Sequence, residues 1–221
     1  MDLSLLKRIK VNQIEMMQLR GKVIPQSEQS IHGLSTQEFG SYIQNRMSNI
    51  GHPLNNVYYG AAGGGQLPVF YIQSDDGGTI KGSEVRERFI NLLAEGKYTD
   101  SILIVLGKIT SLKAILKESP EYNITVFDMN ELLQNPTKHV YSDKVIKKLD
   151  SKEISQLTKT IKPQNLHQLC YDDPIVKFWG FEPGDVLLIN DLIGDDRLMV
   201  KEMRIHKLVG TNSINNFDRN I

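Results

Sequence analysis

The chain lacks the residues on which several classes of protein depend. It has a single cysteine, Cys170, so it can form neither an intramolecular disulfide nor a zinc site built from four thiolates. Its 26 basic and 26 acidic residues cancel, which argues against a protein that binds nucleic acid through its overall charge. No apolar run approaches the roughly 20 residues that a membrane-spanning helix needs, and the first residues show no leader-like apolar core.

Motifs of catalysis are equally scarce. The glycine-rich run Gly60–Gly65 is followed by Gln66-Leu67-Pro68 rather than by the Gly-Lys-Ser/Thr of a phosphate loop, so it predicts a hairpin loop. There is no Gly-x-Ser-x-Gly motif, and nothing marks Cys170 as a nucleophile, so we expect it to be a small packing residue. The histidines show no ligand spacing: His32, His52, His139, His167 and His206. We therefore predict no catalytic residue, no metal and no cofactor.

A metal-dependent nuclease is the enzymatic alternative, since many small α/β domains carry that activity. Such a site needs an acid on one strand and an acid-x-lysine on the next, which together hold the metal beside the scissile phosphate. Asp75-Asp76 could supply the first acid, but the expected second strand, Ser101–Leu106, contains no acid. Asp75 and Asp76 are better explained as turn residues before Gly77-Gly78.

The pattern of apolar residues predicts alternating helices and strands over the first two thirds of the chain. Helices are expected at 2–20, 35–47, 83–95, 112–117 and 128–134, and strands at 57–59, 68–73, 101–106 and 124–127. Lys7, Arg8 and Lys10 are expected on the basic, polar side of the first helix. This alternation predicts an α/β domain, with a mixed sheet and at least one parallel crossover, that ends near Lys138.

The remainder of the chain predicts a smaller α+β domain, 139–209, followed by a polar tail, 210–221. A helix is expected at Ser151–Thr160, and a hairpin should join Val186–Ile189 to Leu198–Ile205. Between them, Asp173-Pro174 should begin a short helix that Gly180 ends, and Pro183-Gly184 should turn the chain into a buried strand. Trp179, beside Phe178, is better explained as a core or interface anchor than as a base-stacking aromatic.

This last segment resembles the signature of the fifth subunit of eukaryotic RNA polymerases and of its archaeal counterpart. The matching positions are Asp173, Pro174, Ile175, Phe178, Gly180, Gly184, Asp185, Val186 and Ile189, and Trp179 stands where the family has phenylalanine. Weaker similarity covers nearly the whole chain: Leu6–Gly21 is similar to the opening helix of the family, Tyr98–Lys113 to a strand and a turn, and Thr137–His139 to the start of its C-terminal module.

The resemblance implies a non-catalytic subunit of a multisubunit DNA-dependent RNA polymerase. It implies that residues 1–138 form a jaw domain beside downstream duplex DNA, and that residues 139–209 dock on the largest subunit. From the residues alone, the turn Gly107–Lys113 is an ordinary helix start; the resemblance favours phosphate contacts instead, made by Lys108, Thr110, Ser111 and Lys113. It assigns partner binding to Asp173, Pro174, Ile175, Phe178, Trp179, Gly180, Gly184 and Val186.

The chain also departs from the family pattern. Thr110 replaces a usual proline, and Glu182, Pro183 and Leu188 occupy a region where the family carries basic residues. These departures, with abundant Asn, Ile and Lys, suggest a subunit from a large DNA virus. A viral subunit would work in the host cytoplasm and the virion, a cellular one in the nucleus. An adaptor outside transcription is the remaining alternative.

Overall fold

The computed structural model describes residues 2–46, 52–61, 64–74, 79–109, 112–138, 144–162, 165–170, 173–192 and 200–209. Only the backbone is described at 113–114, 144–145, 190–192 and 200–209. The chain divides into two compact units, unit 1 at Met1–Gln134 and unit 2 at Asn135–Ile221. Lys138, near which the sequence predicted the boundary, lies in η5 (Pro136–Lys138) at the start of unit 2. The fold is α/β, as the alternation of elements predicted.

A mixed five-stranded sheet forms the centre of unit 1. Its strands, in spatial order, are β1 (Lys22–Val23), β2 (Asn56–Gly60), β3 (Gln66–Ile72), β5 (Asp100–Val105) and β7 (Asn123–Asp128). The pairs β1–β2 and β2–β3 are antiparallel, whereas β3–β5 and β5–β7 are parallel. The predicted hairpin between β2 and β3 and the predicted parallel crossover are therefore confirmed.

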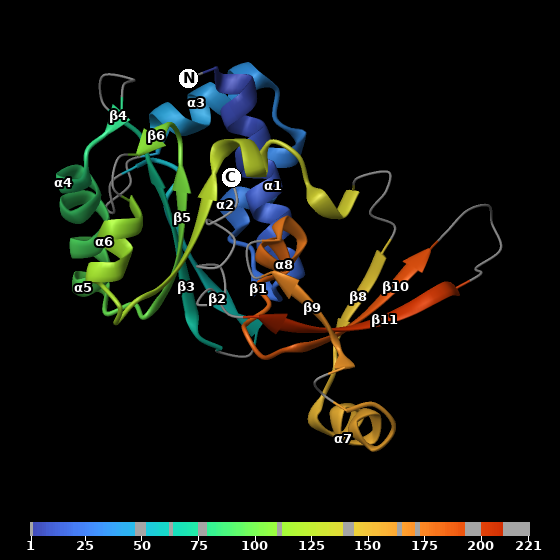
Figure 1. Cartoon of the computed structure of the whole chain (residues 1–221). Helices are drawn as coiled ribbons and strands as arrows, with labels where there is room; N and C mark the ends of the chain where they lie inside the picture. The colour runs from blue at the N-terminus through green and yellow to red at the C-terminus, as the bar shows by residue number, and fades with distance from the viewer. Residues whose placement is uncertain are drawn as a thin grey trace. The chain divides into compact units, whose positions relative to one another are not determined.

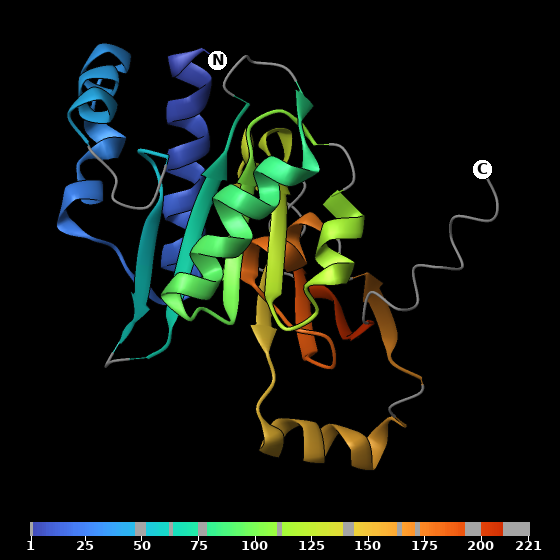
Figure 2. The ribbon, with the colours of Figure 1, turned by 90° about the vertical axis from the view of Figure 1, so that its left-hand side faces the viewer.

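Helices lie on both faces of this sheet. They are α1 (Leu3–Leu19), α2 (Gln26–Gln29), η1 (Ile31–Gly33), α3 (Thr36–Asn45), α4 (Gly82–Val85), η3 (Arg86–Ile90), α5 (Asn91–Gly96), α6 (Leu112–Glu118) and η4 (Met129–Leu132). Figure 1 shows α4, α5 and α6 on one face and α1, α2 and α3 on the other. Figure 2, seen from the side of α4 and α5, shows these two helices crossing in front of the parallel strands.

The strands β3 and β5 are apolar along almost their whole length because both of their faces are covered. On one face, alternate side chains pack against the face of α4–α5–α6 that contains Val85, Phe89 and Leu93. The strand residues in this core are Phe70, Ile72, Leu103 and Val105. On the other face, Tyr71 lies against α1, where its hydroxyl donates to Gln13 Oε1 at 3.2 Å.

The helix predicted at 83–95 is continuous, but its middle turn is wider than an α-helix. Residues Arg86–Ile90 form a π-helix between α4 and α5, which the sequence did not predict. At the end of α5, Lys97 takes the left-handed conformation with φ 53°, and the Tyr98 ring folds back over Gly96. An ideal Cβ on Gly96 would lie 2.0 Å from Tyr98 Cε2, so only glycine fits there without a shift of the ring.

Two expectations for unit 1 were wrong in detail, and one pair of strands was not predicted. The helix predicted at 128–134 is the single 3₁₀ turn η4, which Asp128 caps in a capping box with Glu131. Lys10 is wholly buried and does not lie on the polar side of α1. A two-stranded parallel ladder of β4 (Thr79–Ile80) and β6 (Lys108–Ile109) was not predicted. The predicted turn Asp75–Gly78 lies outside the described residues.

Unit 2 contains a four-stranded sheet in the order β8-β10-β11-β9. Its elements are β8 (Lys144–Lys148), α7 (Ser151–Thr160), β9 (His167–Cys170), α8 (Pro174–Trp179), β10 (Val186–Leu192) and β11 (Val200–Val209). The predicted helix α7 and hairpin β10–β11 are confirmed, whereas β8 and the parallel strand β9 were not predicted. Cys170 is exposed at the end of β9, so its predicted role in packing is wrong. The predicted tail, 210–221, lies outside the described residues.

The strand β10 separates two apolar clusters, because successive side chains of a strand point to opposite faces. Leu187 and Ile189 pack with Val176 of α8. Val186 and the half-buried Leu188 pack instead with the cluster that contains Ile154, Leu157 and Ile161, which lie in or just after α7. Each helix of unit 2 thus covers one face of the same strand.

Candidate functional sites

The predicted DNA-contacting turn follows β5 at the carboxyl end of the unit 1 sheet. Lys108 is exposed there, but it lies in β6 and pairs with β4, so its backbone is part of a ladder and not of an open turn. Thr110 and Ser111 lie outside the described residues, and Lys113 belongs to α6 with only its backbone described. Of the four predicted DNA-contacting residues, Lys108 is therefore the one whose side chain the structure describes, and it is an exposed cation.

The start of the signature segment is built as the sequence predicted. The Asp173 carboxylate caps α8: its Oδ1 accepts from the Ile175 N–H at 2.9 Å and from the Val176 N–H at 3.5 Å. Pro174 occupies the first turn, where its missing N–H costs nothing. Gly180 ends the helix in the left-handed conformation with φ 73°.

The turn that follows is held by its own side chains and by β8. Asp185 accepts the Glu182 N–H through Oδ2 at 2.9 Å, and Gly184 takes a φ of 97° that disfavours any residue with a Cβ. Asp185 also pairs with Lys148 Nζ at 2.8 Å. The sequence did not predict this contact, because Lys148 lies on a strand that it did not predict either.

The predicted partner-binding residues divide by burial into two sets. Phe178 is fully buried and Val186 is nearly so, so both side chains lie inside unit 2. Asp173, Ile175 and Trp179 are half-buried, and Pro174, Gly180 and Gly184 are exposed. The Trp179 ring stacks on Phe181, with centroids 5.8 Å apart and an interplanar angle of 5°. The exposed and half-buried set, centred on α8 and its two glycines, is the part of the signature that faces solvent.

Unit 1 also contains a buried charge network that the sequence did not predict. Its members are Lys10, Gln13, Glu28, Tyr58 and Tyr71. Lys10 Nζ lies 2.7 Å from Glu28 Oε1 and donates to Gln13 Oε1 at 2.8 Å, and neither charged side chain is exposed. Tyr58 donates its hydroxyl proton to the other oxygen of Glu28. The sequence did contain a signal that these two polar residues are buried. Lys10 and Gln13 stand four and seven residues after Leu6, which places them on the apolar face of α1.

The pKa values of Lys10, Glu28 and the nearby His52 are all lowered, but for different physical reasons. Burial lowers the pKa of Lys10 to about 8, against the opposing attraction of Glu28. Burial pushes the pKa of Glu28 upward, but the charge and hydrogen bond of Lys10 outweigh it, so the pKa lies below its ordinary value. Burial and the Lys10 charge together lower the pKa of the nearby His52 to about 4. This imidazole is therefore neutral at physiological pH.

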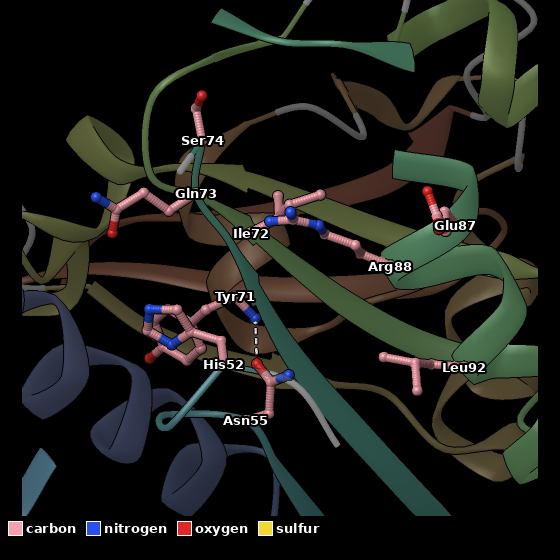
Figure 3. Close-up of a pocket in the computed structure, with 9 residues that line it drawn as sticks. All are labelled: His52, Asn55, Tyr71, Ile72, Gln73, Ser74, Glu87, Arg88 and Leu92. Carbon is pink, nitrogen blue, oxygen red and sulfur yellow. Dashed lines mark hydrogen bonds between the residues drawn. The ribbon is translucent and has the colours of Figure 1, made fainter. Parts of the chain in front are cut away.

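A cavity of about 680 Å³ opens beside the carboxyl end of β3. Its lining residues are His52, Asn55, Tyr71, Ile72, Gln73, Ser74, Glu87, Arg88 and Leu92. Figure 3 shows these side chains coming from the segment before β2, from the end of β3 and the two residues after it, and from η3 and α5. His52 stacks on Tyr71 with ring centroids 5.6 Å apart. We call this cavity the β3 notch.

The nuclease alternative requires a group of acids that can hold a metal ion. No group of three or more His, Cys, Asp or Glu side chains in the described ranges is placed to hold a metal ion. The two acids of the nuclease alternative, Asp75 and Asp76, lie outside those ranges. None of the helices that the structure describes has both the length and the apolar character that crossing a membrane requires.

The chain is thus an α/β protein of two compact units. Over 116 residues the chain is 32% identical to "DNA-directed RNA polymerases IV and V subunit 5B" of Arabidopsis thaliana, which covers 51% of this chain and 52% of that protein. It is 28% identical over 114 residues to "DNA-directed RNA polymerase V subunit 5A" of the same plant, covering 50% of each. The chain thus matches about half the length of these curated relatives. No family model matches it.

Proposed function

We propose that this chain is a non-catalytic subunit of a multisubunit DNA-dependent RNA polymerase, of the subunit 5 type. The observation that carries the proposal is the 32% identity, over 116 residues, to a protein named as subunit 5B of two plant RNA polymerases. The signature segment also supports the proposal, because its cap, short helix, glycine stop, turn and strand are all present in order. Synthesis would then take place on other subunits.

Within this proposal, residues 1–138 form a jaw domain and residues 139–209 an assembly domain. The assembly domain docks on the largest subunit through the solvent-facing part of the signature: Asp173, Pro174, Ile175, Trp179, Gly180 and Gly184. Phe178 and Val186 act indirectly, because their burial holds α8 and β10 together beneath that surface. The jaw domain contacts the phosphates of downstream DNA through Lys108, Thr110, Ser111 and Lys113. A net charge of zero suits a subunit whose affinity comes from protein interfaces.

The proposal is tested by purifying the tagged chain from its native source at moderate salt and identifying every retained protein by mass spectrometry. We expect two very large polymerase subunits in equal amounts with the chain, and their sequences would decide between a viral and a cellular enzyme. A viral enzyme would place the chain in the host cytoplasm and the virion, and a cellular enzyme would place it in the nucleus. Recovery of the chain alone would overturn the proposal and leave the adaptor alternative.

The docking surface is tested in the same purification with two variants of unit 2. Trp179→Ala removes the largest half-buried side chain of the signature, and we expect it to lower recovery of the largest subunit. Lys159→Ala, on an exposed position of α7, is the control that should leave recovery unchanged. Equal recovery with both variants would refute the docking role of α8.

The DNA contact is tested on elongation complexes that contain the chain. Each phosphate contact that is lost should reduce the slope of log affinity against log salt by about 1. We expect this reduction for Lys108→Ala and for Lys113→Ala, and none for Lys117→Ala, which lies at an exposed position nearer the end of α6. A slope that stays the same in all three variants would contradict the jaw assignment.

A further inference from the structure

The helix α7 presents to solvent a surface that carries cations and no acid. Its apolar side chains, Ile154 and Leu157, pack on the other side of the helix against Leu149 and Val186. Figure 2 shows α7 lengthwise. We call the exposed residues of this helix and of the two positions after it the α7 outer face: Ser151, Lys152, Ser155, Gln156, Thr158, Lys159, Thr160 and Lys162.

The lysines of the α7 outer face are joined into a row by neutral polar residues. Residues three or four apart in an α-helix are neighbours on its surface. Lys152 therefore lies next to Ser155 and Gln156, and Lys159 lies next to the same two residues on their other side. Lys162 follows the C-cap of the helix. The row runs along most of a ten-residue helix, which is about 15 Å long.

The acids of this segment are engaged away from the α7 outer face. Asp150 Oδ1 caps the helix, accepting the N–H groups of Lys152 and Glu153 at 2.8 Å each. The Glu153 carboxylate pairs with Lys147 of β8. Among the described residues, no acid pairs with the three ammonium groups of the outer face. The outer face is therefore a local positive surface on a chain whose net charge is zero.

Every side chain of the α7 outer face can donate a hydrogen bond. An ammonium group carries three donors, an amide two, and a hydroxyl one. Thr158 donates its hydroxyl to the Ser155 carbonyl at 3.1 Å, whereas the other side chains of the face make no hydrogen bond with a described residue. A phosphate diester carries a negative charge and its oxygens accept hydrogen bonds, most strongly from charged donors. A chain of phosphates thus matches the face in both charge and hydrogen bonding.

The composition of the face distinguishes a duplex from other partners. Protein interfaces are depleted of charge at their centre and are anchored by aromatic side chains, and the α7 outer face has neither an aromatic nor an apolar residue. Single-stranded nucleic acids are held by aromatic side chains on which their bases stack. Interfaces with duplex DNA are polar and positively charged, and most of their hydrogen bonds go to phosphate and sugar.

We propose that the α7 outer face binds the phosphate backbone of a double-stranded nucleic acid without reading its sequence. Lys152 and Lys159 each contact a phosphate, and Ser155 and Gln156 donate hydrogen bonds between them. Lys162 adds a third charge beyond the end of the helix. These residues are separate from the α8 docking surface and from the predicted DNA-contacting turn of unit 1. The proposal does not rest on membership of a polymerase, because the whole chain alone can be tested for it.

The first test is lysine footprinting, which needs no variant. The whole chain is acetylated with and without a short duplex of random sequence at low salt, and the modified lysines are identified by mass spectrometry. We expect the duplex to slow acetylation of Lys152, Lys159 and Lys162 several-fold. Lys117, an exposed residue of α6, should react at the same rate in both samples. Unchanged reactivity of the three lysines, or equal protection of Lys117, would overturn the proposal.

A pair of double variants measures the contribution of the two helix lysines to duplex binding, by fluorescence anisotropy at several salt concentrations. Each phosphate contact contributes about 0.9 to the slope of log affinity against log salt, and is therefore worth roughly tenfold in affinity at about 50 mM salt relative to 1 M. The variant with Lys152→Gln and Lys159→Gln should lower the slope by about 2. The variant with Arg8→Gln and Lys117→Gln, at exposed positions of unit 1, removes the same charge and should keep the parent slope.

Equal slopes in the two double variants would show that the chain responds to net charge alone, and the proposal would be wrong. Competition in the footprinting assay decides the class of partner. Polyglutamate that protects the three lysines as well as the duplex does would make the face a site for acidic protein, and the proposal would fail. Stronger protection by a single strand than by the duplex would refute the commitment to a duplex.

Discussion

Replacing Lys10 by methionine tests the buried charge network most directly. Methionine keeps the unbranched stem that fills the space inside unit 1, and it removes the charge. Glu28 would then remain buried, with the Tyr58 hydroxyl and with Arg46, whose nitrogen lies 3.5 Å from Glu28 Oε1. The substitution therefore isolates the cost of leaving a carboxylate without its nearest cation.

The magnitude follows from the two distances. At an effective dielectric constant of about 20, unit charges 2.7 Å apart attract by about 6 kcal/mol, and charges 3.5 Å apart by about 5 kcal/mol. Removing one member of a buried pair usually costs about 3–5 kcal/mol, because the partner is left uncompensated. Since Arg46 still faces Glu28, we expect the lower end, about 3 kcal/mol of the free energy of unfolding.

The assay is urea unfolding at pH 7, followed by far-ultraviolet circular dichroism. The control is the double variant Lys10→Met with Glu28→Gln, which removes both charges and should recover to within about 1 kcal/mol of the parent. A single variant within about 0.5 kcal/mol of the parent would refute the reasoning. A double variant less stable than the single one would refute it too.

The parent protein and the Lys10→Met variant can also be compared at different pH values. The pKa of Lys10 is about 8 in the folded chain, against an ordinary value of 10.5, so the folded state binds fewer protons between these values. The contribution of Lys10 to the free energy of unfolding is therefore lowest below pH 8, and it rises as the pH increases from about 8 to 10.5. Tyr58 and Tyr71, whose pKa values burial raises, act oppositely above pH 10 but are present in both proteins. The advantage of the parent over Lys10→Met should grow as the pH rises from 8, and a constant difference would exclude the lowered pKa.

Three further substitutions probe other parts of the fold by urea unfolding. Gly96→Ala should cost about 1–3 kcal/mol, because its Cβ would displace the Tyr98 ring from the core, and an unchanged midpoint would show that the ring moves freely. Asp173→Ala should cost about 1 kcal/mol through the lost cap of α8, whereas Asp173→Asn should be nearly neutral; equal losses would assign the effect to charge. Phe178→Ala should cost about 3–5 kcal/mol, and more than Trp179→Ala, since Phe178 is fully buried; the reverse order would place the anchor at Trp179.

Local signals predicted the parts of the fold that depend on a few neighbouring residues. The helices predicted at 35–47 and Ser151–Thr160 begin at the capping boxes Ser35–Glu38 and Asp150–Glu153, each of which joins groups only three residues apart. The cap and glycine stop of α8 follow from the same short-range chemistry. The pattern of apolar residues also sufficed for β3 and β5, whose short, continuous apolar runs are typical of strands buried on both faces.

Long-range pairing explains what the sequence did not predict. The strand β9 exists because it pairs in parallel with β11, whose residues lie about forty positions later in the chain. Lys10 is buried because Glu28, eighteen positions away, neutralises it, and neither residue marks the other in the sequence. The β3 notch depends on where β2 begins relative to β3, which is a matter of register.

Unit 2 holds both the only tryptophan and the only cysteine of the chain. Trp179 is half-buried in a stack with Phe181, and the thiol of Cys170 is exposed. The chain therefore carries an indole fluorophore at the end of the proposed docking helix and a single thiol for attaching a dye at the end of β9. Association of unit 2 with a partner can be followed optically, by indole emission or by transfer to a thiol-linked acceptor, without introducing a single mutation.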